Sequence, residues 1–358
     1  MKVLIDIGHP AHVHYFRNTI KNLEDNGHSI VVTARNREFV FDLLKSYNIS
    51  YYDRGKGKNT ILGKLFDLIR TDLFLLKVSL KHKPDIFLSF SSHYAAQVAY
   101  LLRKPHIAVN DTEHEDNVHS ILTYPFTNSI LTPSSFQNDL GKKQVRFDNV
   151  VEGLYLSQDL FKPDEEIKKI LTLKEEEEYV ILRFVSWNAH HDVGHTGISN
   201  SLKRDLIKLL ETKFKVFISS EEELGEDFKK YRINIPPDKM HDALYKATLF
   251  VGESATMASE SAQLGTQSIF INSLPLMCNI KVGQEAGLIK WFKSSEGVMK
   301  YLKELIKDPN LKMESISKSK EMQNSFINPT RFLTWFVENY PESKRRMEEN
   351  PNYQLKFK

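Results

Sequence analysis

Hydroxyl and carboxylate side chains gather in residues 251–265, VGESATMASESAQLG, directly after the apolar run ALYKATLFV. Gly252 would let the chain turn tightly after a strand, and Ser254 and Thr256 would then lie at a helix start with free backbone N–H groups. Glu260, one turn beyond Thr256, could accept two hydrogen bonds from a ribose diol. The pattern predicts a site for an anion and for sugar hydroxyls. The alternative is that Ser254 only caps the helix and Glu260 faces solvent.

A second polar segment, WNAHHDVGHTGIS, follows the apolar run YVILRFVS. Arg183 inside that strand, Ser186 at its end and His191 in the segment could together hold a diphosphate, assisted by backbone N–H groups. The H-H-D-x-x-H spacing could by itself ligate zinc. Glycines interrupt it, however, and no cysteine contributes. We favour the phosphate interpretation and predict that this loop holds no structural metal.

Candidate acid–base residues follow two earlier apolar runs. His12 lies at the turn after KVLIDI, and its imidazole could act as a base on a substrate hydroxyl because histidine titrates near neutral pH. The glycine pattern of a dinucleotide site is missing from the same turn, so a nicotinamide cofactor is not expected. Asp111 and Glu113 follow HIAVN and are further candidates for the base or for a cation ligand. The alternatives are a core or capping histidine and a helix-capping aspartate.

The elements that must position these residues form two successive series of apolar strands and amphipathic helices. Such alternation is typical of parallel sheets, whose ligands bind beyond the carboxyl ends of the strands. The sequence therefore predicts an α/β fold with two Rossmann-like domains facing a central cleft. We expect them over residues 1–155 and 176–312, joined by a charged linker near 152–175. A helical extension over 313–358 is hypothesised to cross back to the first domain.

Composition excludes several classes of protein. Hydrophobic residues make up 41% and charged residues 27% of the 358 positions, as in ordinary globular proteins. The net charge of +3 is small for this length and argues against a nucleic-acid-binding protein. Cys278 is the single cysteine, which excludes a disulfide framework and fits a reducing cytoplasm. Neither a secretory signal nor a transmembrane helix is expected, because the apolar stretches are short or interrupted by charges.

The segment 56–83 combines Leu, Ile and Phe with many basic residues. Such a basic amphipathic stretch could lie on an anionic membrane. The alternative is an ordinary helix packed on the first sheet with its lysines in water. The basic residues are Lys56, Lys58, Lys64, Arg70, Lys77, Lys81 and Lys83, opposed by Asp67 and Asp72.

The segment VGESATMASESAQLGTQSIFIN resembles the nucleotide-sugar motif of the glycosyltransferase B superfamily, which is shared with non-hydrolysing nucleotide-sugar 2-epimerases. With IDIGHPAHVHYFRNTIKNLEDNGHSIVVTAR, KPDIFLSFSSHYAAQVAYLLRKPHIAVNDTEHE and LRFVSWNAHHDVGHTGIS, it resembles a largely uncharacterised bacterial and archaeal family grouped with that superfamily. The resemblance covers about residues 1–330. In related lipid-intermediate glycosyltransferases the first turn is glycine-rich and ends in a histidine. His12 occupies that place, whereas HPA replaces the glycines.

The resemblance implies a metal-independent glycosyltransferase without a cofactor, acting in cell-surface polysaccharide synthesis. Its donor would be a nucleotide sugar, most simply a UDP-sugar, held by Glu260, by the turn at 252–256 and by the loop at 186–195. The acceptor would be a glycan or a lipid-linked glycan, with the base drawn from His12, Asp111 or Glu113. The competing interpretations are a nucleotide-sugar 2-epimerase and a non-catalytic sugar-nucleotide-binding protein.

Overall fold

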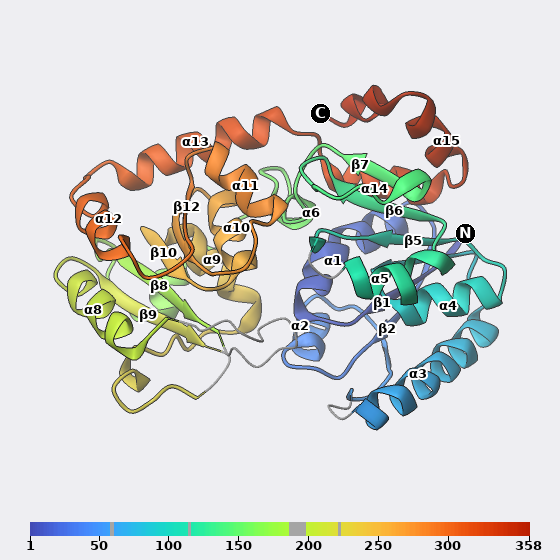
Figure 1. The fold of residues 1–358 in the computed structure, drawn as a ribbon, viewed down its shortest axis with the longest axis horizontal. Coiled ribbons are helices and arrows are strands. Elements are labelled where there is room, and N and C mark those ends of the chain that lie inside the picture. The colour runs from blue at the N-terminus through green and yellow to red at the C-terminus, as the bar shows by residue number, and fades with distance from the viewer. Residues whose placement is uncertain (58–60, 114–115, 186–197, 221–222) are drawn as a thin grey trace. The chain divides into compact units, whose positions relative to one another are not determined.

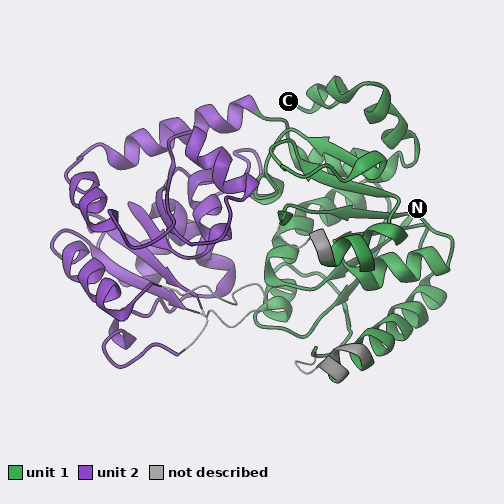
Figure 2. Cartoon of the chain, viewed as in Figure 1, with its two compact units in different colours: residues 1–155, 326–358 green, residues 156–325 purple. Residues whose placement is uncertain are grey.

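The computed structural model describes two compact units (Figure 2). Unit 1 comprises Met1–Tyr155 and Phe326–Lys358, and unit 2 comprises Leu156–Ser325. The chain therefore leaves unit 1 once and returns to it, so that the segment 313–358 is divided between the units. The described residues are 1–57, 61–113, 116–185, 198–220 and 223–358.

Unit 1 contains a seven-stranded parallel sheet with the strand order β3-β2-β1-β4-β5-β6-β7. The order reverses between β1 and β4, and this is the point where parallel α/β sheets bind ligands. Residues 3–7 of β1 are all buried, which explains their near-continuous apolar sequence. The strands are β1 (Lys2–Ile7), β2 (Ser29–Ala34), β3 (Tyr52–Asp53), β4 (Ile86–Phe90), β5 (His106–Val109), β6 (Ser129–Pro133) and β7 (Gln144–Phe147).

Helices cover both faces of this sheet (Figure 1). Right-handed crossovers place the helices after β1 and β2 on one face and those after β3, β4 and β5 on the other. Contacts follow the same division, because α1 packs with α2 and α14 whereas α3 packs with α4 and α4 with α5. The helices are α1 (Pro10–Asp25), α2 (Val40–Ser46), α3 (Ile61–His82), α4 (His93–Leu101), α5 (Asp116–Leu122) and α6 (Gly153–Leu156).

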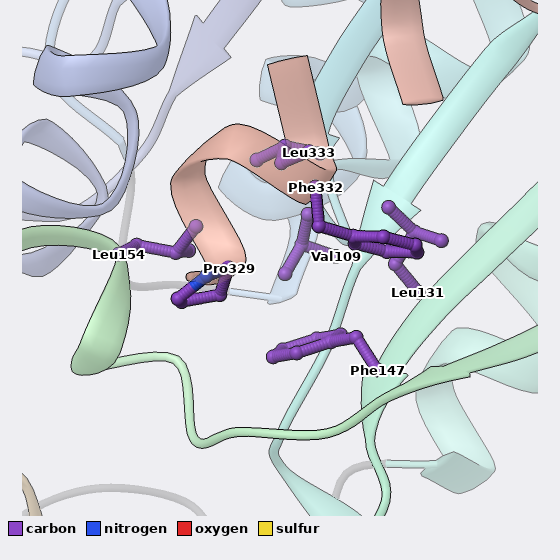
Figure 3. A pocket seen from close by; sticks show the side chains of 7 residues that line it. All are labelled: Val109, Leu131, Phe147, Leu154, Pro329, Phe332 and Leu333. Carbon is purple, nitrogen blue, oxygen red and sulfur yellow. The ribbon is translucent and has the colours of Figure 1, made fainter. Parts of the chain in front are cut away.

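The C-terminal segment completes the core of unit 1. It contains α14 (Pro329–Glu338), α15 (Glu342–Glu349) and a final 3-10 helix (Pro351–Phe357). Phe332 and Leu333 of α14 lie against β5 and β6 around a small apolar cavity (Figure 3). Thr330 anchors the helix start by donating to the carbonyl of Leu154 at 2.7 Å. The side chains that line the cavity are all apolar, so it supplies core packing and carries no candidate chemistry.

Unit 2 contains a five-stranded parallel sheet with the order β12-β11-β10-β8-β9. The prediction of two Rossmann-like parallel-sheet domains is therefore confirmed. The strands are β8 (Tyr179–Phe184), β9 (Lys215–Ser220), β10 (Leu249–Gly252), β11 (Gln267–Ile271) and β12 (Ile289–Phe292). The helices are α7 (Ile167–Ile170), α8 (Asn200–Leu210), α9 (Met240–Lys246), α10 (Ala255–Gln263), α11 (Cys278–Glu285), α12 (Val298–Leu305) and α13 (Leu311–Ser325).

Helix α3 is the longest apolar helix of the described ranges. Its sequence is interrupted by Asp67, Arg70, Asp72 and Lys77. Across the parts of the chain that the structure describes, no helix combines the length and the apolar character that crossing a bilayer requires.

Candidate functional site

In unit 2 the candidate site lies where β10 ends and α10 begins. Ser254 is the N-cap of α10, and its hydroxyl accepts a hydrogen bond from the backbone N–H of Met257 at 3.3 Å. One cap satisfies only part of the donors at a helix start, so further N–H groups are directed to the carboxyl edge of the sheet. Thr256 lies in the first turn and is partly exposed. This arrangement suits an oxyanion, which the helix dipole also favours.

Gly252 occupies the last position of β10, and its role differs from the predicted tight turn. It pairs in register with Arg183 of β8, and its φ does not lie in the left-handed region. A Cβ atom at this position would lie 2.6 Å from the carbonyl oxygen of Arg183. The glycine is needed because the two strands approach closely. The Arg183 guanidinium in turn donates from Nη1 to the hydroxyl of Ser219 on β9 at 2.9 Å.

Glu253 joins the candidate site although the sequence analysis passed it over. Its side chain is only 2% exposed, and its two carboxylate oxygens accept hydrogen bonds from different segments. The N–H of Val185 lies 3.2 Å from Oε2 and that of Ile198 lies 2.6 Å from Oε1. One buried carboxylate thus ties together the two residues that flank positions 186–197. The predicted ligands Ser186 and His191, and with them the prediction about metal, lie outside the described residues.

Glu260 is 5% exposed, so the alternative in which it faces solvent is wrong. Its Oε1 lies 3.0 Å from Nε2 of His241 on α9, which is also buried. Burying a carboxylate is unfavourable unless it is hydrogen-bonded, and the histidine meets that need. His241 was missed because it lies 19 residues before its partner, on a short helix without a distinctive pattern.

In unit 1, His12 lies in the first turn of α1, and its Nδ1 accepts a hydrogen bond from the N–H of Gly8 at 3.3 Å. Loss of hydration holds the pKa of the imidazole well below its usual value, and the nearby cations His9, Arg54 and Arg37 lower it further. His12 is therefore neutral at pH 7. Because Nδ1 is an acceptor, the proton resides on Nε2. In this tautomer Nε2 is a hydrogen-bond donor.

Asp111 and Glu113 lie in the loop after β5, and both are partly exposed. Glu113 stabilises a neighbouring loop, because its Oε1 accepts from the N–H of Gln137 at 2.8 Å and its carbonyl accepts from the Asn138 side chain at 3.2 Å. Asp111 accepts a hydrogen bond from the hydroxyl of the adjacent Thr112 at 3.0 Å.

A buried ion pair below His12 was also missed by the sequence analysis. Asp6 is 1% exposed and Arg54 is 6% exposed, and Oδ1 of the aspartate lies 3.2 Å from Nε of the arginine. The signal for this pair was an aspartate inside the otherwise apolar run KVLIDI. Its partner lies 48 residues later in the chain, so no local pattern could identify it.

Comparisons with known proteins agree with this architecture. An uncharacterised protein of Methanocaldococcus jannaschii is 26% identical over 279 residues, which is 75% of this chain and 81% of the relative. Among solved structures, the UDP-GlcNAc 2-epimerase of Neisseria meningitidis bound to UDP-GlcNAc is similar with a TM-score of 0.67 and 17% identity, covering 91% of this chain and 99% of the epimerase. A glycosyltransferase of Streptomyces sp. SF2575 gives a TM-score of 0.57 at 12% identity, covering 93% and 99%.

At such identities the structural similarity shows the fold alone, which is that of the glycosyltransferase B superfamily. Family membership follows from the sequence match, which extends over residues 1–313. The chain belongs to the family described as "Protein of unknown function (DUF354)".

Proposed function

We propose that this protein is a metal-independent glycosyltransferase that moves a sugar from a nucleotide-sugar donor to a glycan or lipid-linked acceptor in cell-surface polysaccharide synthesis. The observation that carries the proposal is the start of α10, where a capped helix N-terminus follows a parallel strand above a buried carboxylate. The similarity to a 2-epimerase solved with UDP-GlcNAc and to a glycosyltransferase supports a UDP-sugar as the donor.

In this proposal unit 2 binds the donor. The N–H groups and hydroxyls of Ser254 and Thr256 hold the diphosphate, and Glu260 binds the ribose diol. The helix N-terminus then stabilises the negative charge that develops on the departing nucleoside diphosphate. Because Glu260 is already fixed by His241, its carboxylate loses little conformational freedom when a ligand binds.

Unit 1 binds the acceptor in this proposal, and Asp111, one of the three candidates predicted from the sequence, is its base. The aspartate removes the proton from the acceptor hydroxyl as the hydroxyl oxygen attacks the anomeric carbon of the donor. The bond from that carbon to the diphosphate oxygen breaks in the same step. His12 contributes a hydrogen bond from Nε2, since its Nδ1 accepts the N–H of Gly8.

Isothermal titration calorimetry with UDP, GDP, ADP, CMP and TDP tests the donor site. We expect one of these nucleotides to bind, and we expect Glu260→Gln to weaken binding while preserving the side-chain volume. Loss of one charged acceptor corresponds to about 1–3 kcal/mol. His241→Asn is the matched control, because it alters the partner of Glu260 without removing the carboxylate. Failure of all five nucleotides to bind the wild-type protein would contradict the proposal.

A nucleotide-sugar 2-epimerase is the second candidate, favoured by the TM-score of 0.67 to an enzyme of that name. Epimerisation at C2 breaks a C–H bond of the sugar and needs no acceptor. Incubation with UDP-GlcNAc alone in deuterated water distinguishes the two functions. Formation of the C2 epimer with deuterium at C2 supports the epimerase. Binding without turnover on any donor and acceptor would instead indicate a sugar-nucleotide-binding protein.

A lipid-linked acceptor is supported by the outer surface of unit 1. Helix α3 buries Leu75 and Val78 against the sheet, yet it also exposes a second apolar face. Further exposed apolar residues lie on α4, which packs beside α3, and on α5, which packs against α4 (Figure 1). On α3 the exposed residues are Phe66, Ile69, Leu73 and Leu80, each between 56% and 60% exposed, and on α4 and α5 they are Tyr100, Leu101, Val118 and Ile121.

This apolar surface carries exposed cations, Lys77 and Lys81 on α3 and Arg103 after α4. Apolar side chains ringed by basic ones fit an anionic bilayer, so we propose that unit 1 docks on the inner face of the cell membrane. Each basic residue near the surface contributes about 1 kcal/mol. The alternative of a helix with its lysines in water accounts for Leu75 and Val78 but not for the exposed face.

Co-sedimentation with phosphatidylserine vesicles at low and at physiological salt tests this docking. Leu73→Asp and Lys81→Glu should each reduce binding. Met313→Asp on α13 is the matched control, because Met313 is an exposed apolar residue of unit 2. Equal binding of all variants, or no binding of the wild type at either salt, would remove the membrane from the proposal.

A further inference from the structure

Three arginines, Arg35, Arg37 and Arg54, and one histidine lie close to the carboxyl ends of β1, β2 and β3 in unit 1. Arg35 directly follows β2, Arg54 directly follows β3, and His12 lies in the first turn after β1. Backbone hydrogen bonds of 2.9 Å fix this edge, because the N–H of Arg35 donates to the carbonyl of Ile7 and the N–H of Arg54 donates to that of Ala34. The strand ends therefore hold these side chains at one place on the sheet.

Arg54 is buried, and its guanidinium has more hydrogen-bond donors than the described protein has acceptors for them. Asp6 forms an ion pair with its Nε, but Asp6 also accepts from the hydroxyls of Thr33 at 2.8 Å and Ser92 at 2.6 Å. Nη2 lies beside Gly8, where a Cβ atom would be 3.3 Å away. Within the described residues, Nε of Arg54 is buried without a hydrogen bond, which is costly for a guanidinium, and no hydrogen bond to the described protein involves its terminal nitrogens.

Arg35 supplies a second guanidinium that is only partly exposed. The backbone makes room for it at Gly57, where a Cβ atom would lie 2.1 Å from its Nη2. Among the residues that the structure describes, its side chain has no hydrogen bond and no ion pair. Burial lowers the pKa of Arg35, and the charges of Arg37 and Arg54 lower it further. Like charges have thus been gathered where each raises the energy of the others.

Negative charge at this edge does not balance the arginines. Asp6 opposes one of the three cations, and the nearby Asp67 is paired with Arg70 at 2.5 Å. The two histidines next to Arg54, His12 and His93, both have lowered pKa values, about 4 for His93, because burial desolvates them. They are neutral at pH 7 and act as hydrogen-bonding groups. The edge therefore has excess positive charge and uncommitted donors, as an oxyanion requires.

We propose that Arg35, Arg54 and His12 form an anion-binding pocket in unit 1 that holds the phosphate or carboxylate group of the acceptor. The guanidinium nitrogens donate to the anion oxygens, and Nε2 of His12 donates one further hydrogen bond. The pocket stands on the geometry of unit 1, whereas the assignment of its anion to the acceptor rests on the proposed function. An acceptor of this class is a sugar with an acidic group, such as a uronic acid or a phosphorylated sugar.

Thermal-shift and calorimetric titrations of the whole chain test the pocket with glucose 6-phosphate, glucuronate and neutral glucose. We expect at least one of the two anions, but not glucose, to raise the Tm. The two anions separate the phosphate from the carboxylate. Arg35→Gln should weaken anion binding at least tenfold, and Arg345→Gln, which alters an exposed arginine of α15 in the same unit, should leave it unchanged. Lack of stabilisation by both anions, or equal affinities of Arg35→Gln and wild type, would overturn the proposal.

Nucleotide titrations keep this proposal separate from the proposed function. Anion binding that survives when no nucleotide binds leaves the pocket in place and contradicts the glycosyltransferase. Loss of UDP binding in Arg35→Gln, with no effect of either sugar anion, would show that the arginines hold the diphosphate of the donor and would overturn the acceptor assignment. Arg54→Gln exposes Asp6 to loss of its partner, so its circular dichroism spectrum must match wild type before its affinity is compared.

Discussion

The carboxyl edges of the two sheets occupy the same place in the fold but carry opposite kinds of side chain. In unit 1 this edge presents arginines. Two of them, Arg35 and Arg54, have guanidinium donors that form no hydrogen bond with the described residues. In unit 2 it presents Glu253 and Glu260, and both carboxylates are buried and hydrogen-bonded within the protein. In unit 2, Glu253 therefore fixes the backbone, whose N–H groups at the start of α10 are proposed to bind a ligand together with Glu260. In unit 1, by contrast, we propose that the arginine side chains themselves bind the ligand.

This difference between the units predicts which substitutions change the stability of the fold and which change only ligand binding. Removing Glu253 at the edge of unit 2 should destabilise the fold, because it breaks hydrogen bonds that hold the backbone. Removing Arg35 at the edge of unit 1 should leave the fold intact, because its side chain has no hydrogen bond or ion pair with the described residues.

The largest effect is expected for Glu253→Ala. The substitution leaves the buried N–H groups of Val185 and Ile198 without their acceptor, at a cost of about 4 kcal/mol in the free energy of unfolding, roughly 2 for each group. Urea denaturation of wild type and variant measures it. Glu253→Gln keeps one acceptor oxygen and should lose about half as much. Glu296→Ala, which removes an exposed carboxylate of unit 2, is the control. A midpoint for Glu253→Ala equal to wild type would contradict the backbone role.

Acid should destabilise unit 1 through His106, at the opposite edge of its sheet. His106 is fully buried between the hydroxyls of Ser89 and Thr127, and burial lowers its pKa to about 3. The unfolded chain therefore binds a proton below about pH 6.5 that the folded chain excludes, so stability falls as the pH decreases. At pH 5 the loss is about 2 kcal/mol.

Urea denaturation at pH 7 and pH 5, followed by hydrogen exchange of amides in β5, measures this dependence. His106→Gln should lower stability at pH 7 but should show a smaller further loss at pH 5 than wild type. An unchanged dependence on pH in the variant would mean that other groups cause the acid effect.

Gly252→Ala is expected to have the next largest effect on the free energy of unfolding. The added methyl group would meet the backbone of Arg183 at 2.6 Å, and two paired strands cannot separate at one residue without losing hydrogen bonds. Overpacking of this kind costs about 1–2 kcal/mol and lowers the Tm by a few degrees. Gly225→Ala is the matched control in the same unit, because nothing lies within 4 Å of its Cβ position. If both variants melt alike, the close approach of the strands does not explain this glycine.

The smallest effect on stability is expected for Arg35→Gln. Arg35 has no hydrogen bond or ion pair with the described residues, and burial, followed by repulsion from Arg37 and Arg54, lowers its pKa. Its removal should change the free energy of unfolding by less than about 0.5 kcal/mol, although we expect it to weaken anion binding. A clear loss of stability of Arg35→Gln in the absence of anions would show that this arginine also stabilises the fold. The proposed difference between the charged side chains of the two units would then be wrong.

The sequence predicted those features that depend on neighbouring residues. The strand and helix series, the Ser254 cap and the end of α1 near Gly27 all follow from short-range patterns of apolar spacing and turn residues. The reason for Gly252 could not be predicted, because its partner Arg183 lies 69 positions earlier. The same applies to Glu253 with Val185 and to Asp6 with Arg54. The partners are far apart in the sequence, so no short-range pattern shows that they are in contact.

The path of the chain has a consequence for the order in which the protein is made. Synthesis delivers Leu156–Ser325 as a continuous segment, so every residue of unit 2 has been added to the chain before Phe326–Lys358 is translated. Unit 1 must wait for that last segment, which supplies Phe332 and Leu333 to its core. During this interval the apolar side chains of β5 and β6 that pack against α14 in the complete fold have no partner. The N-terminal unit is therefore completed last, against the usual order of domain folding on the ribosome.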